Sequence, residues 1–354
     1  MIVAKFNINR GDFIMNADLS IPASGITALY GPSGCGKTTL MRAMAGLDHH
    51  KNGFMQVGNM KWQSTGQFIA THRRSLAYVF QEASLFAHLN VRANLEYGYK
   101  RIPASERKIK LDKAIELLGI KHLLDRKPVN LSGGERQRIA IARALVVSPK
   151  LLLMDEPLAA LDQKSKQEIL VYLESVHTEL DIPIIYISHS SDEVARLADH
   201  LVLLEEGKVT ASGPIGDMLT RLDLPLAQGT DAETLIEAKV VGHDGEFNLT
   251  YLELAGSRFT VTRHDLAIGK MARLRVLACD VSITLQHQAD TSILNIFPAV
   301  VDEIKNEGTA QVIIRLLVGG VPMLSRITRK SASILDLKPG KQVYAQAKSV
   351  ALLA

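Results

Sequence analysis

The sequence predicts a parallel α/β domain with an inserted helical subdomain, followed by an all-β domain of small OB-like barrels. Short apolar runs alternate with helix-patterned stretches through the first two thirds of the chain, which is typical of a parallel sheet. Residues from about 85 to 135 are helix-patterned and lack such runs, which predicts the insertion. Past residue 222, short β-rich segments separated by Gly turns take over. We expect an α/β domain at 1–222, a linker and first barrel at 223–289, and a second barrel at 290–354.

The composition fits a folded globular protein and excludes several classes of function. The formal charge is only +4 and no block of basic residues occurs, so we expect no nucleic-acid partner. The two cysteines, Cys35 and Cys279, are far apart, which argues against a disulfide framework or a zinc site. We see neither a secretory signal nor an apolar run of about 18 residues that could span a bilayer. A membrane function would therefore need a partner.

The expected strands of the first domain are short apolar runs. They lie at 26–30, 76–80, 151–154, 184–187 and 201–204. Runs that are apolar throughout are typical of strands buried on both faces of a parallel sheet. Parallel strands bring their carboxyl ends to one edge of the sheet, so polar residues that follow these runs are candidates for a site.

The segment Gly-Pro-Ser-Gly-Cys-Gly-Lys-Thr at 31–38 follows the first of these strands and precedes a helix pattern. It matches the P-loop pattern G-x-x-x-x-G-K-[ST], whose glycines let backbone N–H groups surround phosphate oxygens. In this pattern Lys37 contacts the β and γ phosphates, and the hydroxyl of Thr38 ligates Mg²⁺. The fold is therefore predicted to be of the P-loop NTPase type, with ATP and Mg²⁺ as cofactors. The expected ATP-binding residues of this segment are Gly31, Pro32, Ser33, Gly34, Cys35, Gly36, Lys37, Thr38 and Thr39.

Two carboxylates end the apolar run at 151–154. Asp155 is placed to hold Mg²⁺ through water, and Glu156 is placed to polarise the attacking water as a general base. Alone, a strand that ends in two acids is more often a solvated turn. After a P-loop, the same pattern indicates nucleotide hydrolysis.

The segment Leu-Ser-Gly-Gly-Glu-Arg-Gln at 131–137 decides the class. Ser132 precedes a helix pattern, and the N–H groups of a helix start form a second phosphate-binding surface. With this signature motif the chain resembles the ABC transporter ATPases over residues 1 to about 220. The resemblance implies that Ser132, Gly133 and Gly134 bind ATP by facing the γ-phosphate held by the other subunit of a head-to-tail homodimer.

The same resemblance assigns roles to three further polar residues. Gln81, after the second apolar run, is expected to contact Mg²⁺ and the attacking water and to report to the membrane partner. Asp162 is expected at the ATP site, and His189 is expected to hydrogen-bond the γ-phosphate. The catalytic set is then Glu156, His189, Gln81 and Lys37, and the metal set is Thr38, Gln81 and Asp155.

The family usually supplies an aromatic ring upstream of the P-loop that stacks on adenine. Phe13 is available, whereas the spacing favours Arg10 or Gly11. Arg10 could stack through its guanidinium plane. Because Phe13 could equally be a core residue of a strand, the sequence leaves the adenine-stacking residue open.

The tail contains an apparent duplication. The segments 238–240, 268–270 and 278–281 have echoes at 299–301, 339–341 and 347–350. Two related small β-barrels account for this pattern.

The tail also resembles the molybdate-binding Mop domain, and the whole chain resembles the ATPase subunits of bacterial molybdate importers. The segments that support this resemblance lie at 85–88, 187–190, 291–295, 317–320, 326–328 and 347–350. Hydroxyls and one cation suit a tetrahedral oxyanion, and the candidates are Ser292, Thr328, Ser331, Lys348 and Ser349. Leu294 stands where the oxyanion-binding versions are expected to have a basic residue. The alternative is a regulatory barrel without a ligand.

The resemblance implies a set of partners and a location. These are a homodimer, integral membrane permease subunits, an extracytoplasmic substrate-binding protein reached indirectly, and a peripheral position on the cytoplasmic face of the inner membrane. ATPases for sulfate, iron, sugar or polyamine import remain alternatives, because their tails are related β-barrels. A soluble ABC ATPase of translation or DNA repair is less favoured. Those proteins generally have tandem ATPase units or a long coiled coil, and the sequence has neither.

Overall fold

The computed structural model describes residues 1–11, 13–229 and 231–353, and the side chain of Arg10 is outside this description. The chain divides into two compact units, Met1–Gly213 and Pro214–Ala354. None of the helices in the described residues is long and apolar enough to span a membrane.

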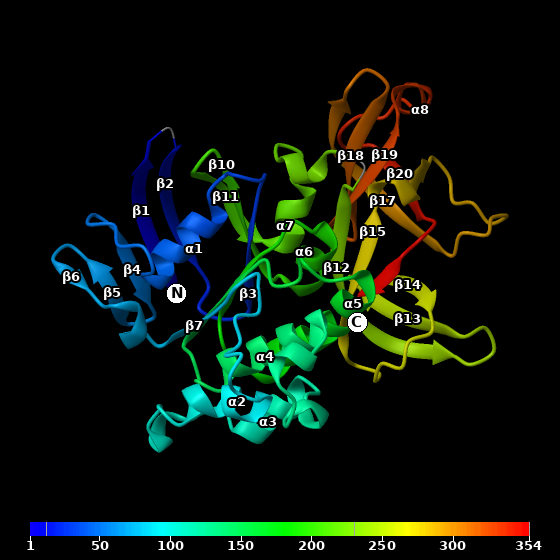
Figure 1. The fold of residues 1–354 in the computed structure, drawn as a ribbon. Helices are drawn as coiled ribbons and strands as arrows, with labels where there is room; N and C mark the ends of the chain where they lie inside the picture. The colour runs from blue at the N-terminus through cyan, green and yellow to red at the C-terminus, as the bar shows by residue number, and fades with distance from the viewer. Residues whose placement is uncertain (12, 230, 354) are drawn as a thin grey trace. The chain divides into compact units, whose positions relative to one another are not determined.

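An eleven-stranded sheet is the centre of the first unit, with the order β6-β5-β4-β1-β2-β11-β10-β3-β9-β8-β7 (Figure 1). The strands are β1 Ile2–Arg10, β2 Phe13–Ile21, β3 Ile26–Tyr30, β4 Phe54–Val57, β5 Met60–Ser64, β6 Gln67–Phe68, β7 Leu76–Val79, β8 Leu151–Asp155, β9 Ile184–Ile187, β10 His200–Glu205 and β11 Lys208–Pro214. The neighbours β10, β3, β9, β8 and β7 are parallel, whereas β4, β1 and β2 pair antiparallel. Each strand expected from an apolar run is present in the parallel part.

Helices cover this sheet and form the predicted insertion. They are α1 Lys37–Ala45, α2 Val91–Tyr99, α3 Leu111–Leu117, α4 Gly133–Leu145, α5 Gln163–Glu179 and α6 Ser191–Leu197. Short 3₁₀ turns lie at Thr71–Arg73, Ala104–Glu106, Lys121–Leu123 and Pro128–Asn130. The helices α2, α3 and α4 pack on one another beside the edge that ends in β7 (Figure 1). Alternate residues of β7 face different cores: Ala77 and Val79 join the core under these helices, whereas Tyr78 packs against the core on the α1 side.

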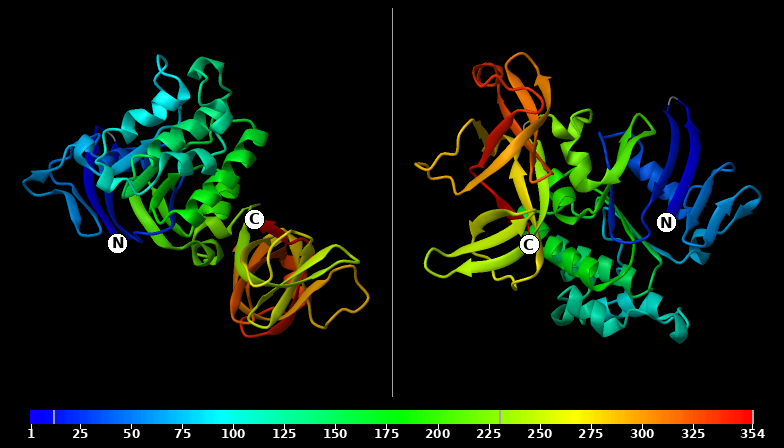
Figure 2. Two further views of the ribbon diagram at one scale, coloured as in Figure 1. Left: turned by 90° about the horizontal axis from the view of Figure 1, so that it is seen from below. Right: turned by 180° about the vertical axis from the view of Figure 1, so that it is seen from behind.

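The second unit is built from two five-stranded sheets with the orders β14-β13-β12-β15-β21 and β16-β20-β17-β18-β19. Figure 2 draws these strands in yellow-green to red. The strands are β12 Glu233–Asp244, β13 Leu249–Leu254, β14 Ser257–Thr262, β15 Met271–Leu277, β16 Val281–Thr284, β17 Asn295–Glu307, β18 Gln311–Val318, β19 Val321–Thr328, β20 Gln342–Ala347 and β21 Ala351–Leu353. The helices are α7 Ile215–Thr220 and α8 Arg329–Ile334, with 3₁₀ turns at Pro225–Ala227 and Ala278–Asp280. Both sheets contribute side chains to one hydrophobic core. The all-β tail agrees with the predicted fold class.

The duplication seen in the sequence is repeated in backbone hydrogen bonds. In the first copy Val240 N–H donates to Lys270 O at 2.9 Å, and Gly269 N–H donates to Val240 O at 2.7 Å. In the second copy Val301 N–H donates to Lys341 O at 2.9 Å, and Gly340 N–H donates to Val301 O at 2.7 Å. Both long strands, β12 and β17, have a register shift just after this valine. The two segments therefore have the same local geometry.

The two halves expected on either side of residue 290 exchange strands. β16 precedes that residue but pairs with β20 of the later half, and β21, near the end of the chain, pairs with β15 of the earlier half. The tail is thus one unit with a shared core rather than two separate barrels in succession. It begins at Pro214, before the expected boundary after 222, because α7 packs on β12.

Candidate functional site

The loop between β3 and α1 has the backbone that a phosphate cradle needs. Gly34 and Gly36 have φ angles of 80° and 105°, a region that favours glycine. Space also restricts Gly36, because an added Cβ would lie 2.7 Å from the Phe13 ring. The loop leads directly into the N-terminus of α1, whose free N–H groups favour an anion.

Lys37 is buried and points back along this loop. Its Nζ donates hydrogen bonds to Gly31 O and Pro32 O, each at 2.9 Å. A phosphate oxygen is a stronger partner for an ammonium group than a carbonyl, since it adds opposite charge. Lys37 is therefore positioned to neutralise phosphate charge, as the motif predicts.

Thr38 and Asp155 meet, although 117 positions separate them in the chain. The Thr38 hydroxyl donates to Asp155 Oδ1 at 3.0 Å, and Asp155 is 9% exposed. A hydroxyl beside a carboxylate is a hard oxygen donor set of the kind Mg²⁺ prefers, so these residues fit the expected metal. Within the described residues, no group of three or more His, Cys, Asp or Glu side chains is suited to hold a metal by itself.

The second carboxylate oxygen of Asp155 has a partner that sequence reasoning missed. The Tyr78 hydroxyl donates to Asp155 Oδ2 at 2.8 Å. Burial, together with the hydrogen bond to Asp155, raises the pKa of Tyr78 well above its ordinary value. Tyr78 therefore stays protonated and remains a donor. The contact could have been predicted from the place of Tyr78 on β7, on the face of the strand that packs toward α1.

Glu156 and His189 follow the neighbouring parallel strands β8 and β9, and the structure brings them together. The Nε2 atom of His189 lies 2.7 Å from Glu156 Oε1. Glu156 has a φ of 47°, and its N–H donates to Ile187 O at 3.1 Å. A positive φ in a residue with a long side chain is uncommon and tends to occur at functional sites. The backbone thus aims the predicted general base at the predicted γ-phosphate sensor.

A buried carboxylate anchors the segment that holds His189. Glu193 is 5% exposed, and its Oε2 accepts hydrogen bonds from the hydroxyls of Tyr186 and Ser188, each at 2.7 Å. Ser190 caps α6 by accepting from Glu193 N–H at 3.4 Å. Sequence reasoning missed Glu193, because an acid near a helix start is ordinarily a solvated residue.

A cavity of about 520 Å³ lies beside Lys37, Thr38, Glu156 and His189. It is lined by Phe13, Ser33, Gly34, Gly36, Lys37, Thr38, Thr39, Glu156 and His189. The lining joins most of the predicted phosphate-binding residues to two predicted catalytic residues. Phe13 begins β2 and is half-buried at this cavity, so it is placed to face a nucleotide. Arg10, the other candidate for stacking on adenine, has its side chain outside the described part of the chain.

The signature motif builds a helix start away from this cavity. Ser132 caps α4 by accepting from Glu135 N–H, and the Glu135 carboxylate accepts from Ser132 N–H at 2.7 Å. That hydrogen bond lowers the pKa of Glu135. Ser132, Gly133 and Gly134 are not among the described residues that line the cavity.

The glycines of the signature lie close to neighbouring side chains. A Cβ on Gly133 would lie 3.1 Å from the Leu161 side chain, and one on Gly134 would lie 3.2 Å from Ser165. Asp162 caps the adjacent helix α5, where its carboxylate accepts from Ser165 N–H and Oγ. The predicted residues Ser132 to Gly134 and Asp162 therefore start two helices that lie side by side.

Gln81 lies in the loop after β7 and is exposed. It is not among the described residues that line the cavity. Its contact with Mg²⁺ and the attacking water stays a prediction.

In the tail, the structure brings together two of the five oxyanion candidates. Thr328 caps α8, and its hydroxyl lies 2.8 Å from the Ser331 hydroxyl. Ser292, Lys348 and Ser349 are exposed. Leu294 is 65% exposed.

Comparison with known proteins identifies the family. A family model for ABC transporters matches residues 14–159, and a model for the TOBE domain matches residues 291–354. A "Molybdenum import ATP-binding protein ModC" of Aromatoleum aromaticum is 54% identical, over 99% of this chain and 94% of the relative. A protein of the same name from Pseudomonas fluorescens is 54% identical, over 100% and 99%. The chain belongs to the ABC transporter ATP-binding proteins.

Solved structures of ABC transporter ATPases share the fold of the first unit. A component of the cbiONQ ABC transporter complex of Clostridium perfringens has 30% identity and a TM-score of 0.54, over 61% of this chain and 89% of that one. A dimeric ATP-binding cassette bound to ADP and Pi has 26% identity and a TM-score of 0.50, over 61% and 99%. As an ABC ATPase, this protein binds and hydrolyses ATP, and the cavity beside Lys37 and Glu156 is the candidate nucleotide site.

Proposed function

We propose that this chain is the ATP-hydrolysing subunit of a molybdate importer, acting as a head-to-tail homodimer on the cytoplasmic side of a membrane permease. The observation that supports this proposal most is how much of the chain each kind of relative matches. The two solved ABC ATPases described above match 61% of the chain, whereas the two relatives named as molybdenum import proteins match 99% and 100%, tail included. The tail is the part in which importers of different substrates are expected to differ.

The nucleotide site would work with MgATP. Bound Mg²⁺ would neutralise charge on the phosphates during transfer to water. Thr38 and Asp155 would hold the metal, with Gln81 joining after its loop moves. Lys37 would exchange its two carbonyl partners for phosphate oxygens. Glu156 would accept the proton of the attacking water while His189 contacts the γ-phosphate.

A second copy would complete each site. In one copy Ser132 to Gly134 do not line the cavity with Lys37, so the phosphate-binding start of α4 is free to serve a partner's nucleotide. The rate of ATP hydrolysis per chain should then rise with protein concentration before it saturates. A rate per chain that is independent of concentration, for a species that remains monomeric by light scattering with ATP bound, would contradict the dimer.

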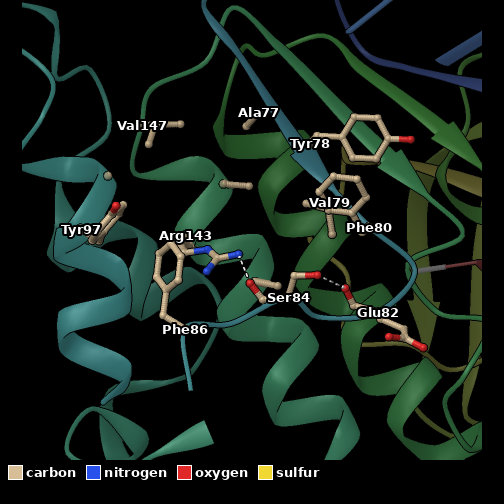
Figure 3. Close-up of a pocket in the computed structure, with 13 residues that line it drawn as sticks. Ala77, Tyr78, Val79, Phe80, Glu82, Ser84, Phe86, Tyr97, Arg143 and Val147 are labelled. Atoms are coloured by element: carbon tan, nitrogen blue, oxygen red, sulfur yellow. Dashed lines mark hydrogen bonds between the residues drawn. The ribbon is translucent and has the colours of Figure 1, made fainter. Parts of the chain in front are cut away.

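A groove beside β7 is the proposed contact for the permease (Figure 3). Its wall includes Phe86, whose ring lies 4.5 Å from that of Tyr97 and 5.0 Å below the Arg143 guanidinium. Arg143 also donates to Ser84 O at 2.6 Å, and burial lowers the pKa of its guanidinium. A half-buried aromatic and a fixed cation suit a short amphipathic helix of a membrane partner.

Cross-linking tests this contact. With cysteine at Ala83 or Phe86, cross-links should form to a cytoplasmic loop of the permease in the assembled transporter. Val129, which is 83% exposed and does not line the groove, offers the control position. Cross-links confined to the ATPase dimer, or equally frequent from position 129, would reject the groove as the contact.

The tail is proposed to bind oxyanion weakly or not at all. The Thr328 and Ser331 hydroxyls share one hydrogen bond, and the position expected to be basic is Leu294. Leu294→Arg should strengthen binding through a charge-assisted contact. Calorimetry of both forms with molybdate checks this, and tight binding by the native chain would refute it.

Transport of radioactive molybdate decides the substrate. Cells that lack this gene should lose high-affinity uptake, and the native gene should restore it whereas Glu156→Gln should not. Sulfate in excess should compete poorly. Unchanged molybdate uptake together with a loss of sulfate, iron, sugar or polyamine uptake would assign the protein to one of those importers.

A further inference from the structure

One carboxylate at the nucleotide site is held from two sides. Asp155 Oδ1 accepts from Thr38 at 3.0 Å, and Asp155 Oδ2 accepts from Tyr78 at 2.8 Å. The two donors come from different elements, since Thr38 is in α1 and Tyr78 is in β7. Together they fix the rotation of the carboxylate. A carboxylate that binds a metal through water needs such a fixed orientation, because a hydrated ion accepts few geometries.

Tyr78 also belongs to the groove beside β7 (Figure 3). Its ring packs on that of Phe80 with centroids 4.4 Å apart and an angle of 33°. Phe80 is 40% exposed and lines the same groove. Phe80 is therefore open to the groove, and Tyr78, two positions earlier in the same segment, contacts the carboxylate that is proposed to bind the metal.

We propose that Tyr78 is a positioning residue that holds Asp155 in its metal-binding orientation and connects the groove wall, through Phe80, to the metal affinity of the nucleotide site. Tyr78 is not among the described residues that line the cavity with Lys37 and Glu156, and its hydroxyl contacts Asp155. It acts through Asp155 alone. The identity of the groove's partner rests on the proposed function. The contacts of Tyr78 with Phe80 and Asp155 do not, because they lie within one chain.

Binding of a fluorescent ATP analogue to the full-length protein, with Mg²⁺ and with EDTA, tests this. Removing an outer-shell partner of a metal ligand typically weakens metal affinity about 10-fold to 100-fold. Tyr78→Phe deletes one oxygen and should weaken Mg²⁺-dependent binding by about 10-fold, while binding in EDTA stays unchanged. Tyr97→Phe, in the same groove, should change neither. Equal weakening with and without Mg²⁺, or no weakening, would overturn the proposal.

Two further variants separate positioning from simple structural support. In an Asp155→Ala background, adding Tyr78→Phe should have no further effect on Mg²⁺ dependence, because the acceptor of the Tyr78 hydroxyl is gone. Phe80→Ala should shift Mg²⁺ dependence in the same direction by a smaller factor, about 3-fold, since it loosens the ring without removing the hydroxyl. A Phe80→Ala protein with native Mg²⁺ dependence would reject the link to the groove. These measurements need neither permease nor molybdate, so they are independent of the transport assignment.

Discussion

Glu193→Ala should destabilise the first unit by about 2 to 4 kcal/mol, although Glu193 is not among the described residues that line the cavity with Lys37. The Glu193 carboxylate accepts hydrogen bonds of 2.7 Å from the hydroxyls of Tyr186 and Ser188, and Lys166 Nζ lies 3.9 Å from Glu193 Oε1. Tyr186 is 1% exposed, and both burial and the nearby carboxylate raise the pKa of its phenol. After the substitution the phenol is still protonated and no longer has this acceptor.

The size of the effect follows from the two donors. A buried donor left without a partner costs about 1 to 3 kcal/mol, which applies in full to Tyr186. Ser188 loses the acceptor of its hydroxyl proton and keeps only the hydrogen bond that its Oγ accepts from Ser190 N–H at 3.0 Å, and we take its cost at the low end of this range, about 1 kcal/mol. The sum is therefore about 2 to 4 kcal/mol.

A double-mutant cycle isolates the bond between Glu193 and Tyr186. Urea unfolding can be followed by Trp62, the single tryptophan, which is buried in β5 of the first unit. Glu193→Ala and Tyr186→Phe together should cost about 1.5 to 3 kcal/mol less than their separate costs added. Additivity within about 0.5 kcal/mol would refute the reasoning. Because Ser188 precedes His189, ATP turnover should fall in Glu193→Ala while ATP binding persists.

Further predictions concern the nucleotide site and the signature helix. Glu156→Gln should retain ATP binding and lose turnover, because an amide cannot accept the proton; near-native ATPase activity in the assembled transporter would exclude that role. Lys37→Ala should instead lower nucleotide affinity in equilibrium binding. Alkylation of Cys35, 4% exposed in the P-loop, should be slow, block ATP binding and be prevented by MgATP. The lowered pKa of Glu135 adds to the free energy of unfolding at pH values above the pKa of the unfolded state, and this contribution is lost as the pH falls through the pKa of the folded state. Glu135→Gln should therefore weaken the dependence of the urea unfolding midpoint on pH in the acid range.

The parts of the site that the sequence predicts well are those made by contiguous residues. The P-loop is formed by one short segment, so its pattern contains nearly all the information needed to place Lys37 and Thr38. Glu156 and His189 could also be predicted, because each follows an apolar run and the carboxyl ends of parallel strands meet at one edge. Their distance of 2.7 Å is a consequence of β8 and β9 being neighbours.

The residues that sequence reasoning missed depend on contacts without a local pattern. Tyr78 reads only as part of an apolar strand, and its partner Asp155 is 77 positions away. Whether a tyrosine in such a strand reaches a carboxylate depends on strand order and on which face it occupies. Glu193 was missed for a related reason: its burial results from packing against β9, while its position near a helix start is ordinarily exposed.

The tail illustrates the same limit at the level of topology. The duplicated sequence corresponds to two segments with the same local hydrogen bonds, because each copy has a valine in its long strand and a Gly-Lys pair further along the chain. It could not indicate that β16 and β21 pair across the midpoint, since strands of three or four residues have little pattern of their own. Each half therefore pairs with a strand that comes from the other half: β15 with β21, and β20 with β16. The halves therefore share one core, and a truncation at residue 290 would remove strands from both sheets rather than release an intact barrel.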